Sequence, residues 1–135
     1  MSVRYRRPDK KNALSIINAA GEDMRFTLTL KPTDKSATTI VRNIYECFRM
    51  LGDAILVSKG VESTDHLAPL RELMNVRKVY TRRPLRVIDN LRRLRHNVNY
   101  YGYHPKMTEV EDAISIAKCC FVPLARRLLK DLKEQ

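Results

Sequence analysis

The stretch KSATTIVRNIYECFRMLGDAILVSKG, residues 35–60, decides the fold class. Thr33 and Asp34 stand directly before it, and both are residue types that cap the N-terminus of a helix. Its apolar residues recur every three or four positions: Ile40, Ile44, Cys47, Phe48, Leu51 and Ile55. This spacing places an apolar stripe along one side of an α-helix. The sequence therefore predicts a long amphipathic helix that ends at Gly60, a residue type common at helix ends.

The helical spacing continues on both sides of this segment. Before it, a helix is expected from Pro8-Asp9 to about Lys31-Pro32, although the alternating residues 26–30 would also suit a short strand. The apolar stripe of that first helix is Ala13, Leu14, Ile17, Ala20, Met24 and Leu28. After Gly60, residues 66–74 predict a short helix capped by Thr64 or Asp65.

Two more long helices are predicted in the second half of the chain. One begins at Pro84 and ends at Gly102, with the stripe Leu91, Leu94, Val98 and Tyr101. The last opens at Thr108, and Pro123 inside it is expected to kink it. Its stripe is Val110, Ala113, Ile114, Ala117, Cys120, Phe121, Leu124 and Leu128. The predicted fold is all-α, a single domain over residues 1–135. Its four main helices form an up-and-down bundle, with the short helix between the second and the third.

Composition bounds the class of protein. The 135 residues include 26 Lys and Arg against 15 Asp and Glu, a formal net charge of +11, and 44% are hydrophobic. No run approaches the roughly 20 apolar residues of a membrane helix, and the charged start lacks the apolar core of a secretory signal. We therefore expect a cytoplasmic protein with no membrane partner. The charge favours nucleic acid, a nucleotide or an acidic protein as partner, and a merely basic solvated surface is the alternative.

The three cysteines do not predict a disulfide framework or a metal site. Cys47, Cys119 and Cys120 are odd in number and fall in apolar helical patterns, where small buried side chains are common. Zinc needs about four ligands, and no CxxC or HxxxH spacing supplies them. We expect neither a metal nor an organic cofactor.

Basic residues concentrate in residues 71–95, which hold nine Lys and Arg against two Asp and Glu, a local charge of +7. Arginine binds phosphate through two parallel N–H groups, so the segment predicts contacts to a phosphate backbone. The candidates for these contacts are Arg82, Arg83, Arg86, Arg92 and Arg93.

Helical spacing then places Arg92, Arg95, His96 and Asn99 on roughly one side, followed by Tyr100. An amide can bond to a phosphate or a base edge, and a tyrosine ring can stack on a base, which favours RNA as the partner. The alternative is that the arginines are only solvated and that Asn99 and Tyr100 merely cap the helix.

Two stretches of the chain resemble HEPN domains, which are small helical bundles of archaea and bacteria. One is IYECFRMLGDAIL, residues 44–56, followed by Lys59-Gly60 and His66. The other is LRHNVNYYG, residues 94–102. The order and lengths of the expected helices match from about the second helix to the end of the chain.

The resemblance implies an RNA-directed module. Many HEPN domains are metal-independent endoribonucleases whose motif is an Arg, a polar residue, a short spacer and a His, used across a homodimer. Arg95 matches the motif Arg and His96 the polar residue, while a spacer of four places Tyr100 where the His is expected. The implied catalytic candidates are Arg95, Asn99 and Tyr100, with His96 or His104 as other groups for proton transfer. Because Tyr is a poor proton carrier near pH 7, we expect weak or no cleavage.

HEPN domains also accompany small nucleotidyltransferases, so the alternative function is a non-catalytic interaction module for such an enzyme, as in toxin–antitoxin pairs. A structural bundle with no ligand is the third possibility. A homodimer is expected from the resemblance, and the apolar residues Tyr45, Phe48 and Leu56 exceed what one helix stripe needs. Asp53 is expected to pair with Arg92 or Arg95.

Overall fold

Helices make up most of the structure, which is a computed structural model that describes residues 3–63 and 65–135. The helices are α1 (Lys10–Thr27), α2 (Ala37–Lys59), α3 (Ala68–Met74), α4 (Ile88–Tyr101) and α5 (Met107–Glu134), with a 3-10 turn, η1 (Leu85–Val87), before α4. Two strands, β1 (Val3–Tyr5) and β2 (Val61–Ser63), form a small antiparallel sheet. The all-α prediction is confirmed apart from this sheet, which the sequence did not predict.

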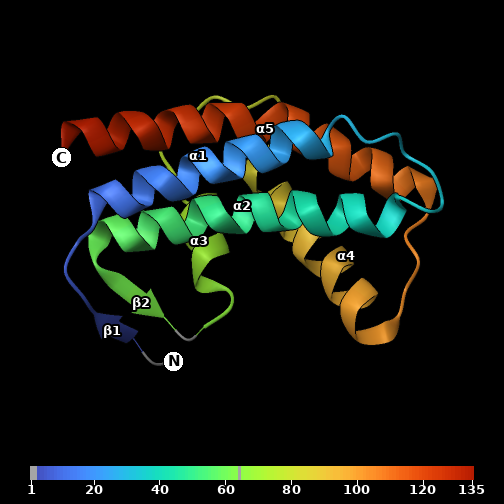
Figure 1. Ribbon diagram of the computed structural model, residues 1–135, viewed down its shortest axis with the longest axis horizontal. Coiled ribbons are helices and arrows are strands. Elements are labelled where there is room, and N and C mark those ends of the chain that lie inside the picture. Colours follow the sequence, from blue (N-terminus) through green and yellow to red (C-terminus); the bar gives the residue numbers. More distant parts are fainter. Residues whose placement is uncertain (1–2, 64) are drawn as a thin grey trace.

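Helix α2 occupies the centre of the fold. Helices α1, α2 and α5 run side by side, while α4 leaves the group at a steep angle and α3 lies beneath α2 with the sheet (Figure 1). Each of the other four helices packs against α2. The long apolar segment 35–60 therefore forms the element around which the other helices assemble.

Local capping explains the helix bounds. The side chain of Asp9 accepts a hydrogen bond of 2.9 Å from the backbone N–H of Asn12, which caps α1 as expected. Helix α1 ends at Thr27, and residues 28–30 form a turn, so they are neither helix nor strand. Thr33 and Ser36 bond reciprocally through backbone N–H groups and hydroxyls, so the N-cap is Ser36, two residues after Asp34, and α2 begins at Ala37. Gly60 and Gly102 end α2 and α4 in the left-handed conformation, with φ of 70° and 62°.

In the second half of the chain, α4 begins later than predicted. Pro84 precedes the 3-10 turn, and α4 itself starts only at the buried Ile88. Helix α5 begins at Met107 and continues through Pro123 as one element. The short helix α3 lies where residues 66–74 predicted it.

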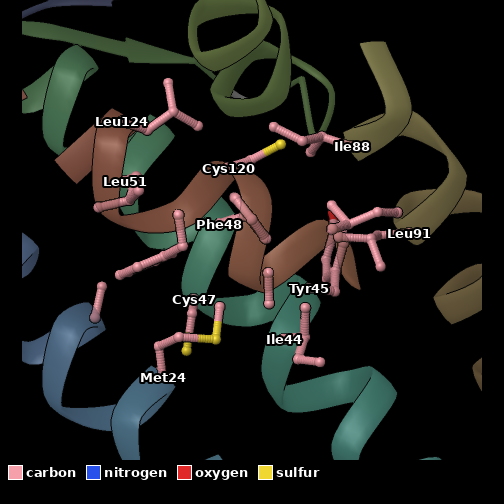
Figure 2. Packing of buried hydrophobic residues seen from close by; sticks show 14 of the residues in the cluster. Met24, Ile44, Tyr45, Cys47, Phe48, Leu51, Ile88, Leu91, Cys120 and Leu124 are labelled. Carbon is pink, nitrogen blue, oxygen red and sulfur yellow. The ribbon is translucent and has the colours of Figure 1, made fainter. Parts of the chain in front are cut away.

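Phe48 lies at the heart of the core, fully buried, with its ring edge-on to that of Phe121 at a centroid distance of 5.5 Å. Figure 2 shows it among Leu51, Cys120 and Leu124. The side chains of Tyr45, Phe48 and Leu56 are all buried within the chain itself. They pack α2 against its neighbours, so these three side chains offer no apolar surface for a homodimer.

Two expected stripe positions, Leu14 and Tyr101, are wrong. Leu14 is 43% exposed because it lies about 100° around the helix from Ala13, the buried position. Tyr101 is 75% exposed because it lies in the last turn of α4, where that helix diverges from α2. On α5, Ile114 is half-buried and packs against the core as predicted, while Ile116, which the sequence did not single out, is fully buried.

The sheet ties the first residues to the end of α2. In it, Arg4 pairs with Glu62 and Tyr5 with Val61, and the backbone N–H of Arg6 donates to the carbonyl of Gly60 at 2.6 Å. A Cβ at Gly60 would overlap the carbonyl oxygen of Arg6, so a glycine is needed there for two reasons, close approach and positive φ. Strands of three residues are too short to show an alternating pattern, which is why the sequence did not reveal them.

Within the described ranges, none of the helices combines the length and apolar character that crossing a membrane requires.

Candidate functional site

The candidate site lies where α4 crosses α2, and Arg95 stands at its centre. The guanidinium carbon of Arg95 lies 5.3 Å from the ring centroid of Tyr45 on α2, a cation–π contact. The side chain of Tyr45 is only 5% exposed, so the ring gives Arg95 a fixed support. Figure 2 shows this ring beside Leu91 of α4.

A second contact joins the two helices one turn further along. Nε of Arg42 on α2 donates to Oδ1 of Asn99 on α4 at 2.8 Å. The bond occupies the carbonyl oxygen of the amide and leaves its NH₂ group directed at other acceptors. Arg95 and Asn99, both predicted site residues, are therefore each held by a residue of α2 that the sequence did not single out.

Three guanidinium groups act on the phenol of Tyr45. Burial raises the pKa of Tyr45 above its ordinary value. The positive charges of Arg95, Arg49 and Arg92 oppose that rise, and the negative charge of Glu46 adds to it. The net direction is upward, so the phenol keeps its proton at neutral pH. A neutral O–H donor thus stands in a positively charged setting.

The five predicted phosphate-binding arginines fall into two groups. Arg92 and Arg93 both pair with Asp89, at 2.7 and 3.0 Å, and the hydrogen bond from Arg92 is the largest cause of the lowered pKa of Asp89. Arg83 pairs with Asp112 at 2.8 Å and also donates to Oγ of Ser115 at 3.2 Å. These three charges are partly neutralised by carboxylates.

Arg82 and Arg86 form the other group. Both are exposed, and among the described residues neither makes an ion pair or a side-chain hydrogen bond. Arg77 and Lys78, in the connector between α3 and η1, are likewise exposed and make no ion pair or side-chain hydrogen bond among the described residues. The basic segment therefore presents uncompensated positive charge to solvent from the connector to the start of α4.

Aromatic rings gather at the C-terminal end of α4. The ring of His96 lies 4.6 Å from that of Tyr100 and 5.8 Å from that of Tyr101, measured between centroids. Tyr100 and Tyr101 are 70% and 75% exposed, which is unusual for large rings and leaves the parts that His96 does not cover open to other molecules.

No contact within the described part of the chain brings a histidine to Arg95. His96 packs on the tyrosines, His104 is exposed in the segment after α4, and His66 is exposed before α3. The arrangement assembles groups that bind an anion, and it does not place the proton carrier that metal-independent cleavage of RNA requires beside the motif arginine.

The expected pairing of Asp53 with Arg92 or Arg95 is wrong. Asp53 instead pairs with Arg49, four residues earlier on the same helix, and Arg49 also bonds to Glu46. Side chains separated by three or four residues on a helix are neighbours, so these local partners are reached first.

Two hollows elsewhere on the surface do not include Tyr45 or Arg95. One, of about 700 Å³, lies between the N-terminal segment and the end of α2, and the other, of about 660 Å³, lies between α1 and α5. Across residues 3–63 and 65–135, no three His, Cys, Asp or Glu side chains gather in a way that could hold a metal ion.

Tyr45 and Arg42 are the residues that sequence reasoning missed as part of a site. In the sequence, Tyr45 counts among the apolar residues of its helix, and Arg42 belongs to no motif. Only the crossing of α4 over α2 brings them to Arg95 and Asn99, which lie 50 and 57 positions further along the chain.

Comparison of the chain with models of protein families, with curated proteins and with solved structures gave no match.

Proposed function

We propose that this chain binds RNA or a nucleotide through the basic surface that runs from the connector onto α4. The observation that carries the proposal is the uncompensated charge of Arg82 and Arg86 in the most basic part of the chain. Unpaired guanidinium groups attract phosphates. When they bind a nucleic acid, counterions are released from its backbone. Arg95 and the exposed rings of Tyr100 and Tyr101 continue this surface along α4.

The resemblance to HEPN domains supports the same proposal. In this interpretation the fold is an up-and-down four-helix bundle of the HEPN kind in which α4 is the tilted member, and the protein acts as a cytoplasmic homodimer. The motif is degenerate: Arg95 would stabilise negative charge on a phosphate, Asn99 would orient it, and Tyr100, His96 or His104 would have to carry the proton. We therefore expect RNA binding with little or no metal-independent endoribonuclease activity.

Salt-dependent binding to a fluorescent single-stranded RNA tests the proposal. The double variant Arg82→Gln, Arg86→Gln should weaken binding and reduce the slope of log affinity against log salt by 1 to 2, the order expected for the loss of two phosphate contacts. The matched control is Arg25→Gln, Arg126→Gln, which removes the same charge from the hollow between α1 and α5. Equal losses in both doubles would show non-specific attraction and contradict the assigned surface.

Cleavage is tested on the same RNA with and without a chelator. Product that forms in chelator and disappears in Arg95→Ala would establish ribonuclease activity and contradict our expectation of little cleavage. Loss of binding in the double variant Arg92→Ala, Arg95→Ala is expected, and tight binding by that variant would place the site elsewhere.

A second candidate is an interaction module for a nucleotidyltransferase. It is favoured by one observation, that no histidine contacts Arg95 within the described residues. The test is to co-express this chain with the proteins encoded next to it and to purify it. Stable co-purification with a nucleotidyltransferase, unaffected by ribonuclease treatment, would support this role over RNA binding.

A further inference from the structure

The hydroxyl of Tyr45 is a polar group without a hydrogen-bond partner in a side chain that is 95% buried. Tyr45 is 5% exposed, and no described residue accepts from or donates to its hydroxyl. Every fully buried side-chain nitrogen or oxygen of the described residues does have a partner. The hydroxyl oxygen is therefore not fully enclosed: the ring lies in the core and the oxygen keeps some access to solvent.

The charged groups that act on this hydroxyl are three arginines, Arg95, Arg49 and Arg92, and one carboxylate, Glu46. The guanidinium of Arg95 lies over the ring at 5.3 Å and pairs with no carboxylate of the described chain. Arg49 and Arg92 are close enough to act on the phenol, but Arg49 is bonded to Glu46 and Asp53, and Arg92 to Asp89. Arg95 is thus the guanidinium on the Tyr45 ring that no carboxylate of the described residues neutralises.

A phosphate group fits these two donors. Its oxygens can accept two parallel N–H groups from Arg95 and, at the same time, one hydrogen bond from a phenol. Because Arg95 contacts the ring that carries the hydroxyl, the two donors lie on the same residue pair before a ligand arrives.

We propose that the Tyr45 hydroxyl and the Arg95 guanidinium together form a binding site for a single phosphate group on the α2–α4 face. The choice of ligand rests on the proposed function, since a phosphodiester within RNA and a terminal phosphate monoester share this chemistry. The site itself depends only on the geometry of Tyr45 and Arg95. It adds a residue of the central helix α2 to a surface that the sequence placed on the connector and α4 alone.

Tyr45→Phe is the decisive variant, because it keeps the ring that packs in the core and supports Arg95 and removes only the hydroxyl. Arg95→Gln removes the other donor. Tyr5→Phe removes an exposed phenol on β1, and Arg126→Gln removes an exposed charge on α5, so they control for each change. Thermal unfolding of all four variants verifies that they fold.

Binding is measured with three probes: inorganic phosphate, a short oligouridine with a 5′-phosphate, and the same oligouridine with a 5′-hydroxyl. Phosphate is titrated by NMR and the oligonucleotides by calorimetry. We expect Tyr45→Phe and Arg95→Gln each to weaken binding of the preferred probe about tenfold, with both controls within twofold of wild type. A preference for the 5′-phosphate would identify a monoester site, and equal affinity for the two oligonucleotides a phosphodiester site.

The two proposals fail in different ways. If RNA binds and Tyr45→Phe binds all probes as wild type does, the phosphate site is wrong and the proposed function stands. If phosphate perturbs the Tyr45 and Arg95 resonances but neither oligonucleotide binds, the site stands and RNA binding is wrong.

Discussion

Arg42 on α2 donates from Nε to Oδ1 of Asn99 on α4 at 2.8 Å, across 57 positions of sequence. This bond and the contact of Arg95 with Tyr45 are polar links between the central helix and the most basic one. They hold the orientation of the surface on which the proposed function depends.

Replacing Asn99 by Asp separates stability from binding. The new carboxylate would keep an acceptor for Arg42, and the position is exposed, so we expect the free energy of unfolding to change by less than about 0.5 kcal/mol. RNA affinity should fall severalfold, because a negative charge now stands beside Arg95. Denaturant unfolding and RNA titration measure the two quantities, and a large fall in both would show that Asn99 is structural.

Asp89 should restrain the RNA affinity of the wild-type protein. It pairs with Arg92 and Arg93 together, so Asp89→Asn would release two guanidinium groups onto the basic face of α4. We expect RNA affinity to rise severalfold. Asp131→Asn is the control, since it adds the same charge and removes one of the two carboxylates that pair with Arg127 on α5, away from this face. A rise of equal size in the control would mean that only net charge matters.

Asp89 also predicts a pH dependence of stability. Its pKa is lowered in the folded state, chiefly by the hydrogen bond from Arg92, so the folded protein favours the carboxylate. This contribution is present above the ordinary pKa of Asp, about 4, and disappears as the pH falls through the lower folded value. Wild type should exceed Asp89→Asn in unfolding free energy by about 1 kcal/mol or less at pH 7, and the difference should vanish under strong acid. A difference that persists in acid would point to packing and away from charge.

Two helical glycines should respond in opposite ways to alanine. A Cβ at Gly52 would overlap the carbonyl oxygen of Pro69 and lie 2.8 Å from its Cα, so Gly52→Ala must push α3 away from α2. We expect a loss of several kcal/mol, as for other overpacked core positions. A Cβ at Gly21 meets nothing closer than 3.6 Å, so Gly21→Ala should stabilise α1 by about 0.5 to 1 kcal/mol. Denaturant midpoints of both variants measure the contrast.

The cysteines should react with a thiol reagent in a fixed order. Burial raises the pKa of Cys47 to about 12 and raises that of Cys120, so both stay protonated and enclosed at pH 8. Cys119 is half-buried and should be the first to react in the native protein. Labelling followed by mass spectrometry should show one fast thiol before unfolding and three in denaturant. Fast labelling of Cys47 would mean that α1 separates readily from α2.

The sequence predicted the helices well because their signals are local. Asp9, Gly60 and Gly102 act on their own turns, and the stripe through Phe48 is visible in any helical projection. The strands were missed because three residues give no period. The exposure of Tyr101 depends on where α4 diverges from α2, which no pattern within α4 records.

Only part of the candidate site could be predicted from the sequence, because its other contacts depend on how the helices pack. Arg95, Asn99 and Tyr100 could be found from charge and composition along α4. The partner of each guanidinium could not, since the pairing of Arg92 with Asp89 and the contact of Arg95 with Tyr45 depend on rotamers and on helix crossing. Asp53 illustrates the limit: a pairing across helices was expected, and a neighbour one turn away was nearer.

The place of Tyr45 in α2 has a consequence for how the molecule would receive a ligand. Its ring belongs to the same packed helix as Phe48, and its hydroxyl keeps some access to solvent. A ligand on that hydroxyl would bind to a residue of the packed central helix, so little ordering of α2 would accompany binding there. The midpoint temperature of thermal unfolding should then rise with ligand concentration, since a ligand that binds the folded chain favours it by mass action.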